Sequence, residues 1–298
     1  MNQFEPFNQT NLFGLNKFIV ELMQLYDNNK LPNKILLSGL KGLGKATLAY
    51  HFINYVLSKN EEFSYNIDEF KINSNNRSFK TIVNKSNPNL ISVDINPDKK
   101  FIDIDQVRKL ILNLNKSSFN KKPRFVLIDN IEFLNINSIN ALLKILEEPS
   151  ENIYFILVNN NKKILPTLKS RCINFKIFLT NNEILDVSNK LLDGNLFELI
   201  NKDLISYYLT PGNIFNLSKF AKINNYDLDT LELKDLLKLI IKDNHYKKDF
   251  LIKYLVFDLI ELYFRKINYS LSSKIYDKYS YFLKRISDTK RFNLDQES

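Results

Sequence analysis

The spacing of apolar residues changes character part-way along the chain. Up to about residue 180, short continuous apolar runs alternate with segments whose apolar residues recur every three or four positions. The continuous runs are typical of buried strands and cover 34–39, 89–95, 124–130, 153–160 and 172–178. The helically spaced segments cover 45–58, 104–116 and 136–149. This alternation predicts an α/β fold with a mainly parallel sheet and helices on both faces.

Two other regions have different patterns. Residues 59–86 are polar and rich in Asn and Lys, which predicts an irregular insertion or a loose hairpin. Beyond about residue 180 the strand-like runs stop, and the second half is predicted to be all-helical. Its helical segments are rich in Leu, Ile and Lys and cover 181–192, 204–209, 230–242 and 248–267. The sequence "LTPGN" at 209–213 predicts a turn between helices.

Composition narrows the class of protein. The chain has 298 residues, of which 44% are hydrophobic and 25% charged, as expected for two or three compact domains with a true core. No apolar run reaches the roughly 18 residues of a membrane helix, and "MNQFEPFNQT" is not a signal peptide. Cys172 is the only cysteine, so neither an internal disulfide nor a cysteine metal cluster can form. We therefore expect a cytoplasmic protein with no membrane partner.

The net charge of +9 has two interpretations. A basic chain is suited to partners with a phosphate backbone. The abundance of Asn, Ile, Lys, Tyr and Phe is equally what an AT-rich genome encodes at permissive surface positions. The charge alone does not separate a nucleic-acid-binding protein from this compositional explanation.

The stretch "GLKGLGKATLA" at 39–49 follows a predicted strand and opens a predicted helix. Its spacing fits a phosphate-binding loop, G-x-x-x-x-G-K-[ST], in which backbone N–H groups and the lysine hold phosphates. The hydroxyl that would hold Mg²⁺ is missing at Ala46, and Thr47 is displaced by about 100° around the helix. A glycine-rich turn without a ligand is the alternative. The nucleotide-binding candidates in this loop are Gly39, Gly42, Gly44, Lys45, Ala46 and Thr47.

Two further candidates follow predicted strands. Asp129 ends "RFVLID" and is suited to holding Mg²⁺ through water. The next position, where a general base is expected, is Asn130, whose neutral amide cannot accept a proton; Glu132 is expected to point differently. Asn159 lies at the carboxyl end of the predicted strand 153–160 and is a candidate polar sensor, as is its neighbour Asn160. Carboxyl ends of parallel strands meet at one edge, so these groups are predicted to converge with the loop.

The sequences "INALLKILEEP" and "IYFILVNNNKKILPTLKSRC" strongly resemble the AAA+ clamp-loader subunits of DNA replication, and the resemblance extends over about residues 8–180. It implies a nucleotide-binding-like AAA+ domain at 1–176, with the parallel sheet of P-loop NTPases. A helical lid at 177–221 and an all-helical collar for oligomerisation at 222–298 would follow.

Within that family the sequence is similar to the delta-prime type. Motor subunits of the gamma/tau type carry Gly-Lys-Thr/Ser and Asp-Glu, whereas this chain has Ala46 and Asn130. The resemblance implies a stator that helps load the sliding clamp on primed DNA with gamma/tau and delta, within the DNA polymerase III holoenzyme. Bound ATP or ADP without hydrolysis stays open. The alternative is an ATP-hydrolysing gamma/tau-like motor that uses Thr47 for Mg²⁺.

The resemblance also assigns individual residues. Arg171 of "SRC" would be an arginine finger that reaches the ATP site of a neighbouring subunit, while Cys172 is expected in the core. Asn213 stands where relatives carry a sensor arginine. The acidic pair Glu147 and Glu148 lies at a helix C-terminus, where the helix dipole disfavours anions. Residues 59–88 contain no cysteine, so the zinc site of many relatives is not expected, and no metal ligands are proposed.

Overall fold

The computed structural model describes residues 5–96, 99, 101–116, 120–147, 152–205, 209–248, 252, 255–267, 277, 280–285 and 288. The chain divides into two compact units, Met1–Phe178 and Leu179–Ser298. Each unit has its own hydrophobic cluster, and each is considered by itself.

The first unit is built on a five-stranded sheet in the order β2-β3-β4-β1-β5, and all four neighbouring pairs are parallel. The strands are β1 (Lys34–Ser38), β2 (Leu90–Val93), β3 (Arg124–Ile128), β4 (Ile153–Asn159) and β5 (Ile173–Lys176). Each lies inside one of the five apolar runs, so the expectation of a parallel sheet is confirmed.

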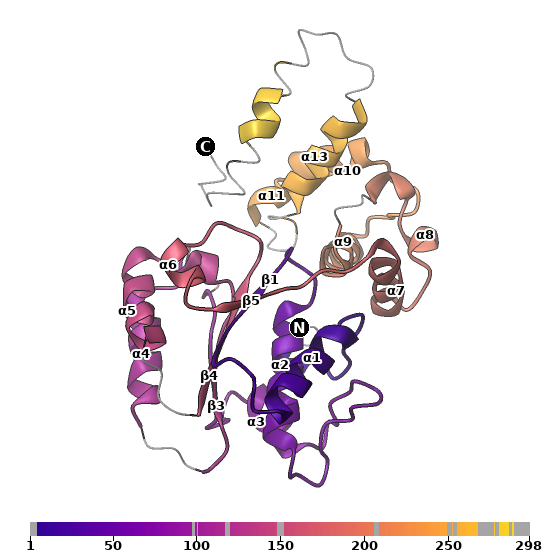
Figure 1. The fold of residues 1–298 in the computed structure, drawn as a ribbon. Helices are drawn as coiled ribbons and strands as arrows, with labels where there is room; N and C mark the ends of the chain where they lie inside the picture. The colour runs from indigo at the N-terminus through magenta and orange to yellow at the C-terminus, as the bar shows by residue number, and fades with distance from the viewer. Residues whose placement is uncertain are drawn as a thin grey trace. The chain divides into compact units, whose positions relative to one another are not determined.

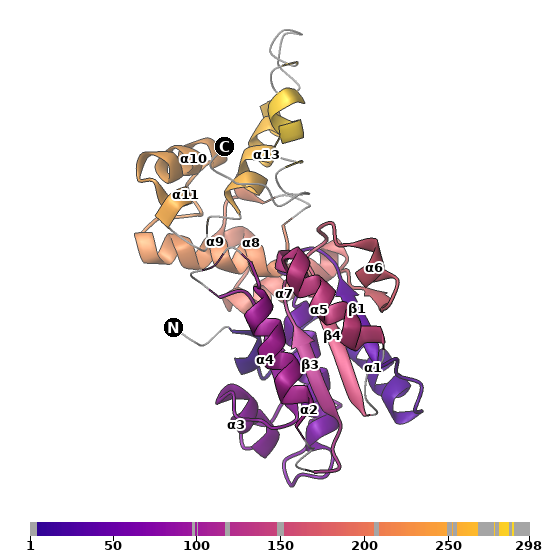
Figure 2. The same cartoon turned by 90° about the vertical axis from the view of Figure 1, so that its left-hand side faces the viewer.

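Helices cover both faces of this sheet (Figure 1, Figure 2). One face carries α1 (Asn16–Asp27), α2 (Lys45–Ser58) and α3 (Arg77–Val83). The opposite face carries α4 (Ile104–Leu114), α5 (Ile136–Glu147) and the single turn α6 (Pro166–Lys169). Two 3-10 turns complete the unit, η1 (Pro6–Asn8) and η2 (Ile131–Phe133). The expected helices at 45–58, 104–116 and 136–149 correspond to α2, α4 and α5, and residues 148–149 lie outside the described part.

The core follows the two-residue period of the strands. Val126 and Ile128 of β3 belong to the cluster that contains Val107 of α4 and Leu142 of α5. Phe125, one position away from Val126, instead meets Phe52 of α2 edge-to-face, with ring centroids 6.1 Å apart. Successive strand side chains point to opposite faces, so a continuous apolar run is what a sheet covered on both faces requires.

The segment 59–86 is more ordered than its polar composition predicts. Asn76 is fully buried and caps α3 by accepting a hydrogen bond from the backbone N–H of Phe79 at 2.8 Å. It also donates to the carbonyl of Phe63 at 2.8 Å and bonds to the buried Asn54 of α2. The expectation of an irregular insertion is therefore wrong at α3. This helix is anchored by buried amides, which leave no apolar period in the sequence.

In the described part of the second unit, every regular element is a helix, as predicted. The elements are α7 (Asn181–Leu192), α8 (Leu196–Leu199), η3 (Lys202–Leu204), α9 (Pro211–Asn224), α10 (Leu233–Lys242), α11 (His245–Lys248) and α13 (Val256–Ile267). They share one hydrophobic cluster that includes Leu217, Leu236 and Leu259. Among the described residues of the whole chain, no helix is both long and apolar enough to cross a membrane.

Two details of this unit differ from the sequence pattern. The helical expectation at 204–209 is wrong at its start, because Leu204 ends η3 and Ile205 is extended; 206–208 lie outside the described residues. The "LTPGN" turn is the start of α9, with Thr210 as its N-cap and Pro211 in the first turn. The separation of lid from collar after residue 221 stays a prediction, and α9 runs through that position.

Candidate functional site

The backbone geometry of the loop between β1 and α2 requires glycine at three positions. A Cβ atom at Gly39 would lie 2.4 Å from the carbonyl oxygen of Ile177, which passes beside the end of β1. Gly42 and Gly44 both have φ of 84°, a left-handed conformation that side chains rarely adopt. The predicted loop geometry is therefore present, and the close approach at Gly39 requires glycine even without a ligand.

Lys45 is the first residue of α2 and is only 3% exposed. Its ammonium group donates to the carbonyl of Leu40 at 2.6 Å and to Oδ1 of Asn160 at 2.9 Å. Burial lowers the pKa of Lys45 to about 8, against the opposing charges of Asp129 and Glu132. The lysine that would hold phosphate is thus already bonded within the chain.

Asn160 links this lysine to the ends of two further strands. Its Nδ2 donates to Oδ1 of Asn130 at 2.7 Å and to Oε1 of Glu132 at 3.0 Å. Nδ2 of Asn130 in turn donates to Oδ1 of Asp94 at 2.7 Å. We call these five residues, Lys45, Asn160, Asn130, Glu132 and Asp94, the strand-end network, because it joins the carboxyl ends of β4, β3 and β2 to the loop.

The strand-end network distinguishes the two asparagine candidates and corrects the expectation for Glu132. Asn160 rather than Asn159 contacts Lys45; the side chain of Asn159 bonds to the backbone N–H and carbonyl of Lys162, both at 3.1 Å, and closes the loop after β4. Glu132 takes part, although its spacing from Asp129 did not predict it. Asn130 has a left-handed backbone, with φ of 55°, and the η2 turn follows it. Together they bring the carboxylate of Glu132 to Asn160.

Asp129 lies at the end of β3 beside the strand-end network. Its carboxylate accepts a hydrogen bond from the backbone N–H of Asn130 at 2.8 Å. Burial and the nearby charge of Asp94 raise the pKa of Asp129 to about 7. Ala46 has no side-chain oxygen, and the described residues contain no group of three or more acidic, His or Cys side chains that could hold a metal ion. The loop therefore lacks the side-chain hydroxyl that a phosphate-binding loop offers to Mg²⁺.

Arg171 lies in the turn between α6 and β5, and 32% of its side chain is exposed. Its guanidinium donates to the carbonyl of Thr167 at 2.8 Å and to Oε1 of Glu147 at 2.6 Å. The neighbouring Cys172 is buried, which raises the pKa of its thiol to about 11 and makes it a core residue. Glu147 thus meets a cation at the end of α5, whereas Glu148 lies outside the described residues.

The second unit holds the remaining candidates. Thr210 is 1% exposed, and its hydroxyl accepts from the backbone N–H of Asn213 at 3.4 Å. Thr210 therefore has a structural role as the N-cap of α9. Asn213 lies in the first turn of that helix.

Comparison with known proteins identifies the family of the chain. The family described as "DNA polymerase III, delta subunit" matches residues 14–180, more than half of the chain. The subunit delta' of Buchnera aphidicola from Schizaphis graminum is 29% identical over 163 residues, covering 53% of this chain and 46% of the relative. Subunit delta' of Pseudomonas aeruginosa is 31% identical over 139 residues, covering 46% of this chain and 40% of the relative.

A gamma subunit is also similar. The subunit gamma of the same Buchnera strain is 24% identical over 266 residues, covering 85% of this chain and 69% of the relative. The chain spans less than half the length of the two delta' relatives. The resemblance to AAA+ clamp-loader subunits is nevertheless confirmed by the family match, and the chain belongs to the DNA polymerase III delta subunit family.

Proposed function

We propose that this chain is a delta-prime-like stator of a clamp loader, and that it does not hydrolyse ATP itself. The observation that carries the proposal is the strand-end network. Lys45, the group that would bind the transferred phosphate, is bonded to Leu40 and Asn160. Within the network, Asn130 stands where a motor subunit has its general base and bonds to Asp94.

Hydrolysis needs two groups that the chain lacks at the expected positions. A hydroxyl after the loop lysine would hold Mg²⁺, and a carboxylate after Asp129 would orient and deprotonate the attacking water. Ala46 and Asn130 can do neither. A nucleotide that entered would have to replace the bonds of Lys45, so bound ATP or ADP without turnover remains compatible with the proposal.

In this proposal, the chain contributes to ATP hydrolysis in a neighbouring subunit through Arg171. An arginine placed against the phosphates of a neighbour's ATP stabilises the charge of the transition state. Arg171 is partly exposed, and its ion pair with Glu147 lies on the protein surface, where such pairs contribute little free energy. The guanidinium can therefore exchange Glu147 for a phosphate at small cost.

The proposed partners are gamma/tau and delta subunits, with the sliding clamp and primed DNA reached through the complex. Similarity to both delta' and gamma proteins supports membership of such an assembly. A cytoplasmic location belongs to the same proposal. The alternative, a gamma/tau-like motor, is supported by similarity to several gamma and tau subunits, three of which match 78–88% of this chain.

The test is to assemble the full chain with gamma/tau and delta and to measure ATP hydrolysis stimulated by primed DNA. Arg171→Ala should remove the share of hydrolysis contributed by the neighbouring site, and Arg171→Lys should rescue it poorly because lysine lacks the planar fork. Lys169→Ala, at an exposed position two residues away, is the matched control. An unchanged rate for Arg171→Ala in an intact assembly would remove the finger role.

A further inference from the structure

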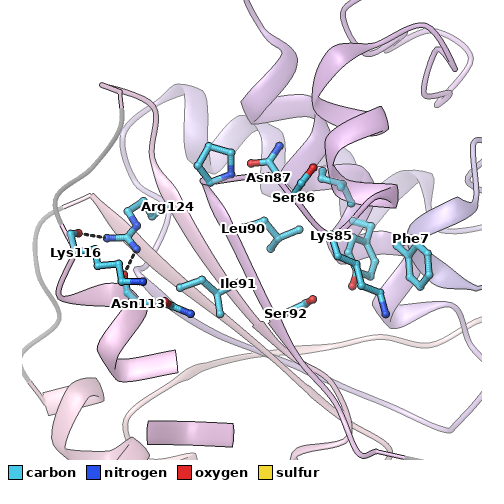
Figure 3. Close-up of a pocket in the computed structure, with 13 residues that line it drawn as sticks. Phe7, Lys85, Ser86, Asn87, Leu90, Ile91, Ser92, Asn113, Lys116 and Arg124 are labelled. Atoms are coloured by element: carbon cyan, nitrogen blue, oxygen red, sulfur yellow. Dashed lines mark hydrogen bonds between the residues drawn. The ribbon is translucent and has the colours of Figure 1, made fainter. Parts of the chain in front are cut away.

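An open groove of about 470 Å³ lies along the outer edge of β2 (Figure 3). β2 is an edge strand of the sheet, and within the described residues it pairs with a strand only on its β3 side. Leu90, Ile91 and Ser92 form the floor of the groove. None of these three side chains is buried, and Ser92 is exposed. The groove therefore exposes both the side chains and the edge of a short strand.

The backbone of β2 can be assigned to its two sides from the register. The N–H of Phe125 donates to the carbonyl of Asn89 at 2.7 Å, and the N–H of Asp129 donates to the carbonyl of Val93 at 2.9 Å. Alternate residues of a parallel strand face the same neighbour, so residues 89, 91 and 93 face β3. The backbone groups of Leu90 and Ser92 then face the groove. The N–H of Leu90 bonds to the carbonyl of Asn87, which leaves the Leu90 carbonyl and both groups of Ser92 directed outward.

The walls of the groove carry charge of one sign. Lys85 lies at one end, with its ammonium 5.6 Å from the ring centre of Phe7. Lys116 and Arg124 lie at the other end, and Figure 3 shows the two ends separated by the β2 floor. The described residues that line the groove include no Asp or Glu. An occupant with negative charge at both ends is therefore complementary to it.

Arg124 is fixed in place at this site. Its Nη1 donates to the carbonyls of Leu114 and Lys116 at 2.9 and 3.0 Å, and its Nη2 donates to the carbonyl of Asn113 at 2.6 Å. These bonds hold the guanidinium at the C-terminus of α4, where its charge also complements the helix dipole. The positive charge beside β2 is thus preorganised rather than carried only by a flexible side chain.

We propose that this groove binds an extended acidic peptide segment of a partner protein, which adds a strand to the free edge of β2. The peptide backbone would bond to Ser92 and to the Leu90 carbonyl, while its carboxylates would face Lys116 and Lys85. An extended peptide supplies alternating N–H and C=O groups that match a strand edge, and a nucleic-acid backbone does not. Four strand residues span about 13 Å, which suits a segment of four to six residues. The proposal does not depend on the clamp-loader role.

The test uses a capped, fluorescent octapeptide of alternating Glu and Val, titrated into the full chain at low salt. Lys116→Glu should weaken binding about tenfold, whereas Lys109→Glu, the same charge change at an exposed position of α4 outside the groove, should leave it within about twofold. Ser92→Pro should also weaken binding about tenfold. It removes an N–H that faces away from β3, a position where an edge strand tolerates proline.

Three results would overturn the proposal. Absence of saturable binding is the first. Equal loss in Lys116→Glu and Lys109→Glu would show a response to net charge alone. Displacement of the peptide by single-stranded oligothymidylate, together with indifference to Ser92→Pro, would identify a general polyanion site. Should Ser92→Pro fail to fold, hydrogen exchange of the Ser92 amide in the unaltered chain decides: the peptide must slow it, and an unchanged rate contradicts strand addition.

Discussion

Asn160 carries more of the candidate site than any residue that the motifs single out. One side-chain amide accepts from Lys45 and donates to Asn130 and Glu132. Three asparagines follow one another at the end of β4, and their identity alone cannot tell which of them turns toward the loop. That choice depends on the backbone after the strand, where Asn159 is used to close the local turn.

Replacing this amide should destabilise the first unit. Asn160→Ala leaves the partly buried amide of Asn130 and the buried ammonium of Lys45 each short of a partner. We expect the free energy of unfolding to fall by about 1–3 kcal/mol. Denaturant unfolding measures it, with Asn182→Ala at an exposed position of α7 as the control. Equal effects of the two substitutions would show that the strand-end network contributes nothing to stability.

At the scale of the element, the apolar period located α2, α4, α5 and α7 from the sequence. α2 and α7 begin and end where their apolar period does, and α7 is also marked by a capping box between Thr180 and Glu183. α1, α3 and α6 were not predicted, and no helical range was assigned to α9. α3 depends on Asn76, whose bonding partners in α2 and at Phe63 are distant in sequence.

The dependence of α3 on its cap gives a direct prediction. Asn76→Ala removes the cap and leaves the Phe63 carbonyl and the Asn54 amide without their bonds. We expect a loss of about 2 kcal/mol in the free energy of unfolding and faster amide hydrogen exchange across α3. Asn75→Ala, one position earlier and exposed, is the matched control and should change neither quantity. Unchanged exchange in Asn76→Ala would contradict this role.

At the scale of the whole molecule, the convergence of the candidate site followed from the sequence, because parallel strands place their carboxyl ends at one edge. The Ala46 and Asn130 positions also indicated from sequence that two catalytic groups were absent. The internal bonding of Lys45 could not be predicted, since it depends on the left-handed backbone of Asn130 and on the η2 turn that redirects Glu132. The Ala46 and Asn130 positions are the basis of our proposal that the chain does not hydrolyse ATP itself.

The most direct measurement is ATP hydrolysis by the purified full chain with saturating ATP and Mg²⁺, beside Lys45→Ala. We expect no turnover above the rate without protein, and no difference between the two chains. The reason is that Ala46 has no hydroxyl to bind Mg²⁺ and Asn130 cannot act as a general base. Robust turnover that Lys45→Ala abolishes would contradict a non-hydrolysing subunit and would establish a motor that uses Thr47.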